Sequence, residues 1–192
     1  MKRFGSIFLL LILLLSGCQQ QSDTILPTPT PTPETADSIV RARCREILDK
    51  YGATIDGIYA YINNDDPLDR LFYNAADMVE APLPEPSDLA LHILDTGKGV
   101  CYHYSALTYY LLQEAGFEAI LITGARKTDG APHRWTMVRT EKGWYHFDPQ
   151  HYQKLLTDEQ KSSNTYLRTD AMEWNREAYP KTAKAFDEAT GV

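Results

Sequence analysis

Residues 97–112 of this chain, GKGVCYHYSALTYYLL, constrain its fold most, because they place a cysteine at the start of an apolar helical pattern. The apolar positions recur in steps of three and four residues, which is typical of one helix face: Cys101, Tyr104, Leu107, Leu111 and Ala115. Gly116 and Phe117 then supply a terminating glycine with its hydrophobic partner. The pattern predicts a buried central helix whose first turn carries Cys101.

After this helix the spacing of the apolar residues changes from a helical to a strand-like period. Residues 119–123, 133–140 and 144–148 read as strands, separated by polar, glycine-containing turns at 126–130 and 141–143. Upstream, helical spacing covers 37–51, 55–62 and 87–94, with a proline-rich loop at 80–86. Residues 157–192 are expected to form a peripheral helix and tail. We therefore expect an α+β fold in which an antiparallel sheet packs on the central helix.

The N-terminus reads as a secretory signal. Lys2 and Arg3 precede an uncharged stretch at 4–17. Its apolar core is shorter than the roughly 20 residues of a transmembrane helix. The ending Leu15-Ser-Gly-Cys18 resembles the bacterial lipobox, which implies cleavage before Cys18 and lipidation of that residue. A simple secreted protein with a chance cysteine at this point is the alternative.

Residues 18–34 are expected to be a lipid-anchored tether rich in proline and threonine. Alternating prolines favour an extended chain of about 3.1 Å per residue, so the 16 residues from 19 to 34 would span up to about 50 Å. A spacer explains this segment more simply than a ligand for a proline-binding module. The remaining residues, 35–192, are sufficient for one domain with a real core.

Charge and cysteine content exclude several classes of protein. Without Lys2 and Arg3 the chain has 17 basic against 26 acidic residues, a formal charge of −9 with neutral histidines. This balance argues against nucleic acid as a partner and against attraction to anionic lipid. Cys44 lies on the apolar stripe of the first predicted helix, so we interpret it as a packing residue. Cys44 and Cys101 could also form one disulfide.

Cys101 has two interpretations. A thiol in the first helical turn meets unpaired N–H groups and the positive end of the helix dipole, which favour the thiolate. With a histidinium nearby, the pKa can fall from about 8.5 into the range of roughly 3.5 to 7.5. Gly97 and Gly99 would then admit a substrate backbone, and the Cys101 N–H could bind an oxyanion. Alternatively, Cys101 is a small core residue.

A nucleophile requires a base and an orienting group, and His133 and Asp148 form the best pair. A four-residue turn at Thr140–Gly143 places Trp135 opposite Asp148, which makes His133 its diagonal neighbour at about 7 to 8 Å between backbones. A three-residue turn without a bulge would put the two side chains on opposite faces.

The other histidines are weaker candidates. His103 points about 200° around the helix from Cys101, given the helical period. His146 is expected to be a half-buried sheet residue, with a supporting or competing base role as the alternative. No partner is evident for His92 or His151. No HExxH or CxxC motif supports zinc binding, so we expect no cofactor and no metal at the conceivable set of His133, His146, Asp148 and His151.

Together these segments resemble the bacterial transglutaminase-like superfamily. The likeness runs from about residue 55 to residue 149 and rests on motifs in the same order: GKGVCYHYS around Cys101, Gly116-Phe, His133-Arg-Trp135 and GWYHFDP around Asp148. The resemblance implies a papain-like α+β fold with Cys101 as nucleophile. It also implies that His133 is the general base and acid and that Asp148 orients it.

The sequence departs from the family pattern in two places. Family members commonly carry Asn after the His-x-Trp motif, where this chain has Thr136. Relatives also have an aromatic residue upstream of the cysteine that helps form the oxyanion site, and Tyr73 is the candidate for it. Gly99 and Trp135 complete the set of residues expected at the oxyanion or substrate site.

These features predict a cell-envelope cysteine hydrolase, peptidase-like or amidase-like, that acts through a thioester at Cys101. The alternatives are a protein-glutamine transglutaminase, in which an amine replaces water, and a noncatalytic surface module that binds peptide. The anchor would hold the protein at the extracytoplasmic membrane surface. Its expected substrates are therefore peptides, proteins or peptidoglycan stems outside the cytoplasm.

Overall fold

The structure is a computed structural model that describes residues 34–64, 68–70, 82–151, 155–163 and 171–183. The predicted signal, the tether up to residue 33, the lipidation site Cys18 and the candidate Tyr73 lie outside these residues. Among the described helices, none combines the length and the apolar character needed to cross a membrane.

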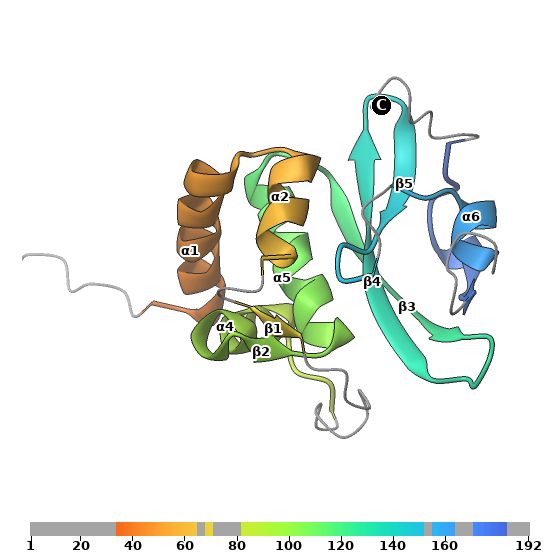
Figure 1. The fold of residues 1–192 in the computed structure, drawn as a ribbon, viewed down its shortest axis with the longest axis horizontal. Helices are drawn as coiled ribbons and strands as arrows, with labels where there is room; N and C mark the ends of the chain where they lie inside the picture. Colours follow the sequence, from red (N-terminus) through yellow and green to blue (C-terminus); the bar gives the residue numbers. More distant parts are fainter. Residues whose placement is uncertain (1–33, 65–67, 71–81, 152–154, 164–170, 184–192) are drawn as a thin grey trace, which may run out of the picture. The chain divides into compact units, whose positions relative to one another are not determined.

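The helices form a layer on one side of the sheet (Figure 1). They are α1 (Ala36–Tyr51), α2 (Ile55–Ile62), α4 (Pro86–Thr96) and α5 (Cys101–Glu114). Helix α5 contacts the other three helices and the sheet, so it is the central helix that the sequence predicts. Its C-terminus also follows the prediction, because Gly116 adopts φ 89° and the Phe117 N–H bonds to the Leu112 carbonyl at 2.9 Å.

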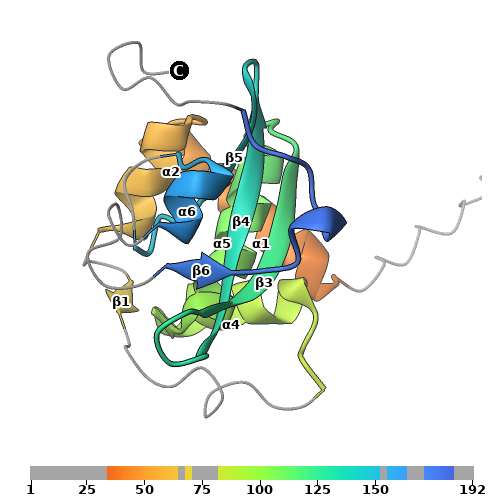
Figure 2. The same ribbon diagram turned by 90° about the vertical axis from the view of Figure 1, so that its right-hand side faces the viewer.

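The main sheet has four antiparallel strands in the order β5-β4-β3-β6 (Figure 2). They are β3 (Ala119–Arg126), β4 (Pro132–Thr140), β5 (Gly143–Phe147) and β6 (Met172–Glu173). The expectation of only a helix and tail after residue 157 is therefore wrong, since β6 pairs with the end of β3. A two-residue strand is too short for alternation to reveal it.

A second, smaller pairing leads into α5. Strand β1 (Asp69–Arg70) pairs in parallel with β2 (Lys98–Gly99), which lies immediately before the N-terminus of α5. This pair was not predicted, because it too has only two residues in each strand.

The turn between β4 and β5 sets the register that the site requires. Thr140 pairs with Gly143 and Thr136 pairs with Phe147, so the predicted four-residue turn is confirmed. Gly143 adopts φ 127°, a conformation that glycine tolerates best. In this register residue 135 stands opposite residue 148, and residue 133 is its diagonal neighbour.

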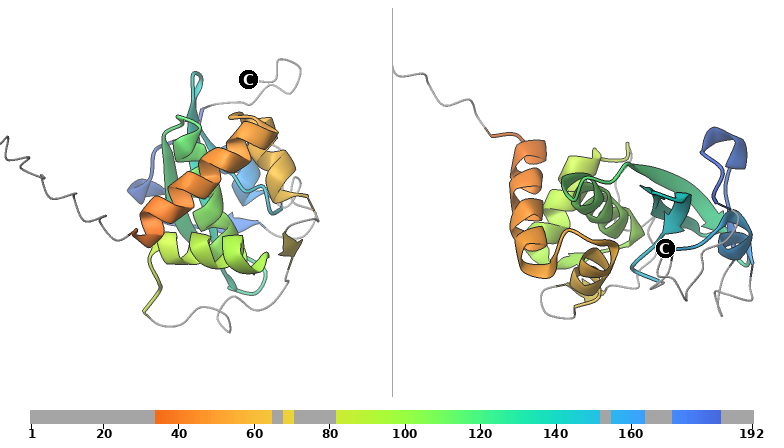
Figure 3. Two further views of the ribbon diagram at one scale, coloured as in Figure 1. Left: turned by 90° about the vertical axis from the view of Figure 1, so that its left-hand side faces the viewer. Right: turned by 90° about the horizontal axis from the view of Figure 1, so that it is seen from above.

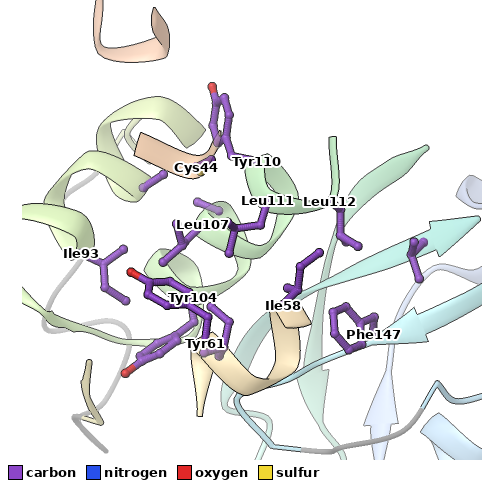
Figure 4. Close-up of a cluster of buried hydrophobic side chains, with 14 of the residues drawn as sticks. Cys44, Ile58, Tyr61, Ile93, Tyr104, Leu107, Tyr110, Leu111, Leu112 and Phe147 are labelled. Atoms are coloured by element: carbon purple, nitrogen blue, oxygen red, sulfur yellow. The ribbon is translucent and has the colours of Figure 1, made fainter. Parts of the chain in front are cut away.

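The main core surrounds α5 (Figure 4). Leu107, Leu111 and Leu112 of this helix are fully buried. They belong to one cluster with residues of the other helices and of the sheet, among them Cys44, Ile58, Ile93, Val138, Tyr145 and Phe147. Cys44 is a packing residue, as predicted, and neither Cys44 nor Cys101 forms a disulfide. Because other elements surround α5, even its polar residues His103 and Thr108 are buried.

A second cluster covers the other face of the sheet. It contains Ile122, Trp135, Met137 and Met172, with Trp174 packed against it. The short helices α6 (Asp158–Ser162) and η1 (Arg176–Ala178) belong to the same C-terminal part of the chain. Figure 3 shows α6 across the sheet from the layer of α1 and α5. The C-terminal segment thus completes the back of the sheet.

Gly99 permits the close approach between β2 and α5. A Cβ at this position would lie 2.6 Å from the His103 Cβ, which cannot swing away because it is fixed to the helix backbone. We predict that Gly99→Ala lowers the free energy of unfolding by about 1 to 3 kcal/mol, the usual range for overpacking. Denaturant unfolding measures this change, with the exposed neighbour Lys98→Ala as control. An unchanged stability of Gly99→Ala would show that His103 has room to move.

Candidate active site

Cys101 is the first residue of α5, and its side chain is almost completely buried, with 8% of its surface exposed. Gly97 ends α4 with φ 68°, and the chain then passes through β2 to the helix start. His103 does not face the thiol, because its Nδ1 accepts the Val100 N–H at 3.2 Å. The backbone N–H groups of Arg134 and Tyr102 bond to the Cys101 sulfur. The nucleophile candidate therefore contacts β4 one residue beyond His133.

The acidity of Cys101 is not that of an activated thiolate, the first of the two interpretations. Its pKa is raised to about 11. Burial is the largest cause and the negative charge of Asp148 adds to it, while bonding backbone N–H groups act in the opposite direction. Position at a helix N-terminus favours the thiolate, but loss of hydration outweighs that effect here. The thiol is accordingly neutral in this structure at pH 7.

His133 and Asp148 form a buried pair, with 5% of each residue exposed. The His133 Nε2 lies 2.7 Å from the Asp148 Oδ2. Burial by itself would raise the pKa of Asp148, but the Lys161 ammonium, together with the neighbouring rings of His133 and His151, holds it well below its ordinary value. Because an ionised carboxylate only accepts hydrogen bonds, Nε2 donates and Nδ1 carries the lone pair. Burial also lowers the pKa of His133, so that the neutral ring is favoured.

The structure brings Cys101 close to this pair without bonding it to His133. Asp148 is near enough to affect the pKa of the thiol, and Arg134 links the sulfur to β4. Among the described residues, however, no hydrogen bond joins Cys101 to the His133 ring. Proton transfer would require the two groups to come within hydrogen-bond distance, and catalytic hydrogen bonds often form only once substrate is bound.

Lys161 is a member of the site that sequence reasoning missed. Its side chain is completely buried, and its Nζ lies 2.7 Å from the Asp148 Oδ2. The same ammonium lies 4.8 Å from the centre of the Trp135 ring. Burial lowers the pKa of Lys161, while the Asp148 charge opposes that change. No sequence signal reveals this role, because a lysine within the polar run DEQKS is typical of an exposed helix.

The indole ring of Trp135 packs against the face of the His133 ring. Its ring stacks on the His133 ring, with centroids 5.6 Å apart and an interplanar angle of 16°. The Trp135 Nε1–H donates to the His146 Nδ1 at 2.9 Å, and the His146 Nε2 donates to Asp158 at 2.9 Å. With 1% of its surface exposed, Trp135 is better suited to positioning His133 than to contacting substrate. His146, expected to be half-buried, is also only 1% exposed.

His151 completes the cluster around Asp148. Its Nδ1 lies 3.3 Å from the Asp148 Oδ1, a partner that the sequence did not reveal. Ligand atoms of His133, Asp148 and His151 lie within 4.8 Å of one another, a spacing that could hold a metal ion. A cation there would compete with the Lys161 ammonium. His146, which the conceivable zinc set also included, bonds instead to Trp135 and Asp158.

The remaining candidates have structural roles. Thr136, at the position where Asn is common, donates from its hydroxyl to the Phe147 carbonyl at 2.5 Å. It therefore joins β4 to β5 beside the site. Gly99 has a packing reason to be glycine, and its expected role at the oxyanion or substrate site stays a prediction.

The transglutaminase-like superfamily matches the chain over residues 34–149, more than half of its length. The chain belongs to this superfamily. The resemblance noted from the motifs around Cys101, His133 and Asp148 is thus confirmed at the level of the family, and so is the predicted fold class. None of the curated proteins matches the chain.

Several solved structures are similar to this transglutaminase-like chain. The periplasmic domain of TgpA from Pseudomonas aeruginosa is 22% identical, with a TM-score of 0.43, and the match covers 64% of this chain and 45% of that one. A proposed cysteine protease from Cytophaga hutchinsonii is 12% identical, with a TM-score of 0.45 and coverage of 76% and 50%. Calcium-bound LapG from Legionella pneumophila is 9% identical, with a TM-score of 0.49 and coverage of 83% and 90%. The match therefore spans about half the length of the TgpA domain.

The buried ion pair of Asp148 and Lys161 allows a prediction about His133. The Lys161 charge lowers the pKa of His133, so its removal in Lys161→Met is expected to raise that pKa. An NMR titration of the His133 ring measures the change, with the exposed turn residue Lys142→Met as control. A His133 pKa that stays the same or falls in Lys161→Met would contradict the prediction.

Proposed function

We propose that this protein is a cysteine hydrolase, peptidase-like or amidase-like, that cleaves acyl substrates through a thioester at Cys101. The observation that carries the proposal is the buried His133–Asp148 pair, joined at 2.7 Å beside the strand residue that contacts the Cys101 sulfur. Membership of the transglutaminase-like superfamily supports the same chemistry.

The first half of the reaction forms the thioester. The His133 Nδ1 takes the proton from the neutral thiol as the sulfur attacks the carbonyl carbon, so thiolate exists only during attack. Asp148 stabilises the resulting imidazolium through the Nε2–H bond, as an orienting carboxylate does in other triads. The N–H groups of Cys101 and Tyr102 bond to the sulfur in this structure, and they would turn to the oxyanion as the sulfur forms the thioester. His133 then protonates the leaving amine.

The second half of the reaction releases the acyl group. Water attacks the thioester while His133 accepts its proton, and collapse of the intermediate returns the neutral thiol and a carboxylic acid. If an amine replaces water, the same steps give a new amide and the protein is a transglutaminase. The two activities differ only in the second nucleophile. A noncatalytic module that binds peptide is the alternative that the neutral, buried thiol favours.

We further propose that the mature chain is lipid-anchored at Cys18 on the extracytoplasmic membrane surface. The signal at residues 1–17, the ending Leu-Ser-Gly-Cys and the following tether support this location. Two or more acyl chains give stable anchoring, whereas one gives only reversible binding. The substrates would then be envelope peptides, proteins or peptidoglycan stems.

An activated ester tests the catalytic proposal without knowledge of the natural substrate. With p-nitrophenyl acetate, the wild type is expected to acquire one acetyl group on Cys101, detectable by mass spectrometry, and then to release acetate. Cys101→Ala should abolish this intermediate. His133→Ala should slow turnover by about 10²- to 10⁴-fold, the usual contribution of a general base. Cys44→Ala is the matched control, because Cys44 is fully buried and its pKa is raised to about 12.

Different outcomes separate the candidate functions. Acetyl transfer to added glycine ethyl ester in preference to water would identify an acyltransferase instead of a hydrolase. If wild type and Cys101→Ala react at the same rate, the site is noncatalytic and the binding-module alternative holds.

Replacing Cys18 tests the anchor. In a bacterial host, Cys18→Ala is expected to move the protein from the membrane fraction to the soluble extracytoplasmic fraction, because the acylated residue is lost. The rate with p-nitrophenyl acetate should not change. Continued retention in the membrane fraction would refute lipidation at Cys18.

A further inference from the structure

Arg134 is a half-buried cation to which the described residues supply no hydrogen-bond acceptor. Its Nε and Nη1 atoms are buried and unpaired, and no salt bridge joins it to any described residue. Other arginines do have carboxylate partners: Arg41 with Glu114, Arg43 with Asp95, Arg126 with Asp129 and Arg139 with Glu118. Burial of charged donors without an acceptor costs free energy. Arg134 therefore lacks an acceptor that the described chain does not supply.

The backbone of Arg134 contacts the nucleophile candidate, and its guanidinium lies near the next residue of α5. Its backbone N–H bonds to the Cys101 sulfur, and its guanidinium carbon lies 6.0 Å from the centre of the Tyr102 ring. Tyr179 and Cys101 are also within electrostatic range of the side chain. Because successive strand residues alternate, Arg134 points to the face opposite His133. The base and the unpaired cation therefore project from opposite faces of β4.

Burial lowers the pKa of Arg134, as expected for a cation that has lost water without gaining a hydrogen-bond acceptor from the described residues. The guanidinium stays charged at neutral pH, because its ordinary pKa is far above that range. Its planar set of N–H donors matches the geometry of a carboxylate. Tyr179 also lines an open groove of about 480 Å³ with Tyr109, Ile120 and Leu121. The Arg134 guanidinium could therefore bind a carboxylate of a substrate, and the groove lined by Tyr179 could hold apolar parts of the same chain.

We propose that Arg134 binds a carboxylate of the substrate, close to the acyl group that Cys101 attacks. This inference rests on the proposed function, which makes Cys101 the nucleophile. The substrate class is an acidic peptide, in which the carboxylate belongs to a side chain or to the chain terminus. Arg134 is a specificity residue, whereas His133 and Asp148 carry the proton transfer.

Two alkylating reagents of similar size test the proposal. Iodoacetate carries a carboxylate and iodoacetamide does not, and both react with Cys101 in the full chain, as measured by mass spectrometry of the Cys101 peptide. Arg134→Gln is expected to lower the ratio of the iodoacetate rate to the iodoacetamide rate by about tenfold, the size expected for one charged hydrogen bond. Taking the ratio within each variant cancels changes in thiol acidity or folding. Arg139→Gln, an exposed residue of the same strand, is the matched control and should leave the ratio unchanged.

Arg134→Lys separates a binding site from a general effect of charge. Lysine keeps the charge but loses the planar donor set, so this variant should also lose most of the preference for iodoacetate. Full preference in Arg134→Lys, or an equal ratio in wild type and Arg134→Gln, would overturn the proposal.

A direct titration decides the proposal even if Cys101 is inert. The Arg134 Nε–H signal in an NMR spectrum of the full chain, assigned by its loss in Arg134→Gln, should shift with a carboxylate ligand. N-acetyl-glutamic acid α-amide supplies a side-chain carboxylate and N-acetyl-alanyl-alanine supplies a terminal one, so the ligand that shifts the signal identifies the source. N-acetyl-glutamine α-amide is the neutral control. No shift with either acid would refute the site. The proposed function is tested separately by acetylation of Cys101 with p-nitrophenyl acetate, so failure of one proposal can be told from failure of the other.

Discussion

The carboxylate of Asp148 is the group on which the rest of the site depends. It is buried, and it accepts contacts from His133, Lys161 and His151, which come from β4, from α6 and from the turn after β5. A buried carboxylate is stable only when such partners replace its lost water. The C-terminal segment therefore supports the site directly, because it delivers Lys161 to the far face of the sheet from α5. Without Lys161, the buried carboxylate of Asp148 would have only His133 and His151 as partners among these three contacts.

The groups around Asp148 act on the pKa of His133 in opposite directions. Asp148 favours the imidazolium, while burial and the Lys161 charge disfavour it. The balance leaves a neutral ring that can accept a proton, with its tautomer fixed by the ionised carboxylate. Trp135 and His146 add a second constraint, because the indole N–H occupies the His146 Nδ1 and keeps that lone pair from being protonated. Burial also lowers the pKa of His146. His133 and His146, both neutral, therefore lie against the same Trp135 ring with fixed tautomers. The His133 Nε2 donates to Asp148, and the His146 Nδ1 accepts from the indole N–H.

The sequence predicted those parts of the fold that depend on periodicity and turn length. Helix α5, the three longer strands and the contact between His133 and Asp148 follow from apolar spacing and from a single turn register. The missing parts have other causes. Strand β6 is too short to show alternation, and Lys161 lies in a run that is typical of an exposed helix. The two interpretations of Cys101, an activated thiolate and a small core residue, could not be separated from the sequence, because helix position is visible in a sequence whereas the depth of burial is not. Arg134 was passed over for the same reason, since an arginine in a strand normally reaches solvent.

The high pKa of Cys101 is compatible with its proposed work outside the cytoplasm. The thiolate is the form that attacks disulfides and is oxidised, so a thiol whose pKa is raised to about 11 reacts slowly with both. A neutral resting thiol would therefore be preserved in an oxidising compartment, and Cys44 is protected in the same way by complete burial. The cost is that attack requires proton removal at the moment of reaction. His133 is placed on β4 next to the residue that bonds the sulfur, and its free Nδ1 is the atom suited to that step. Reactivity would thus arise when substrate brings the thiol and the imidazole together, instead of being present in the resting protein.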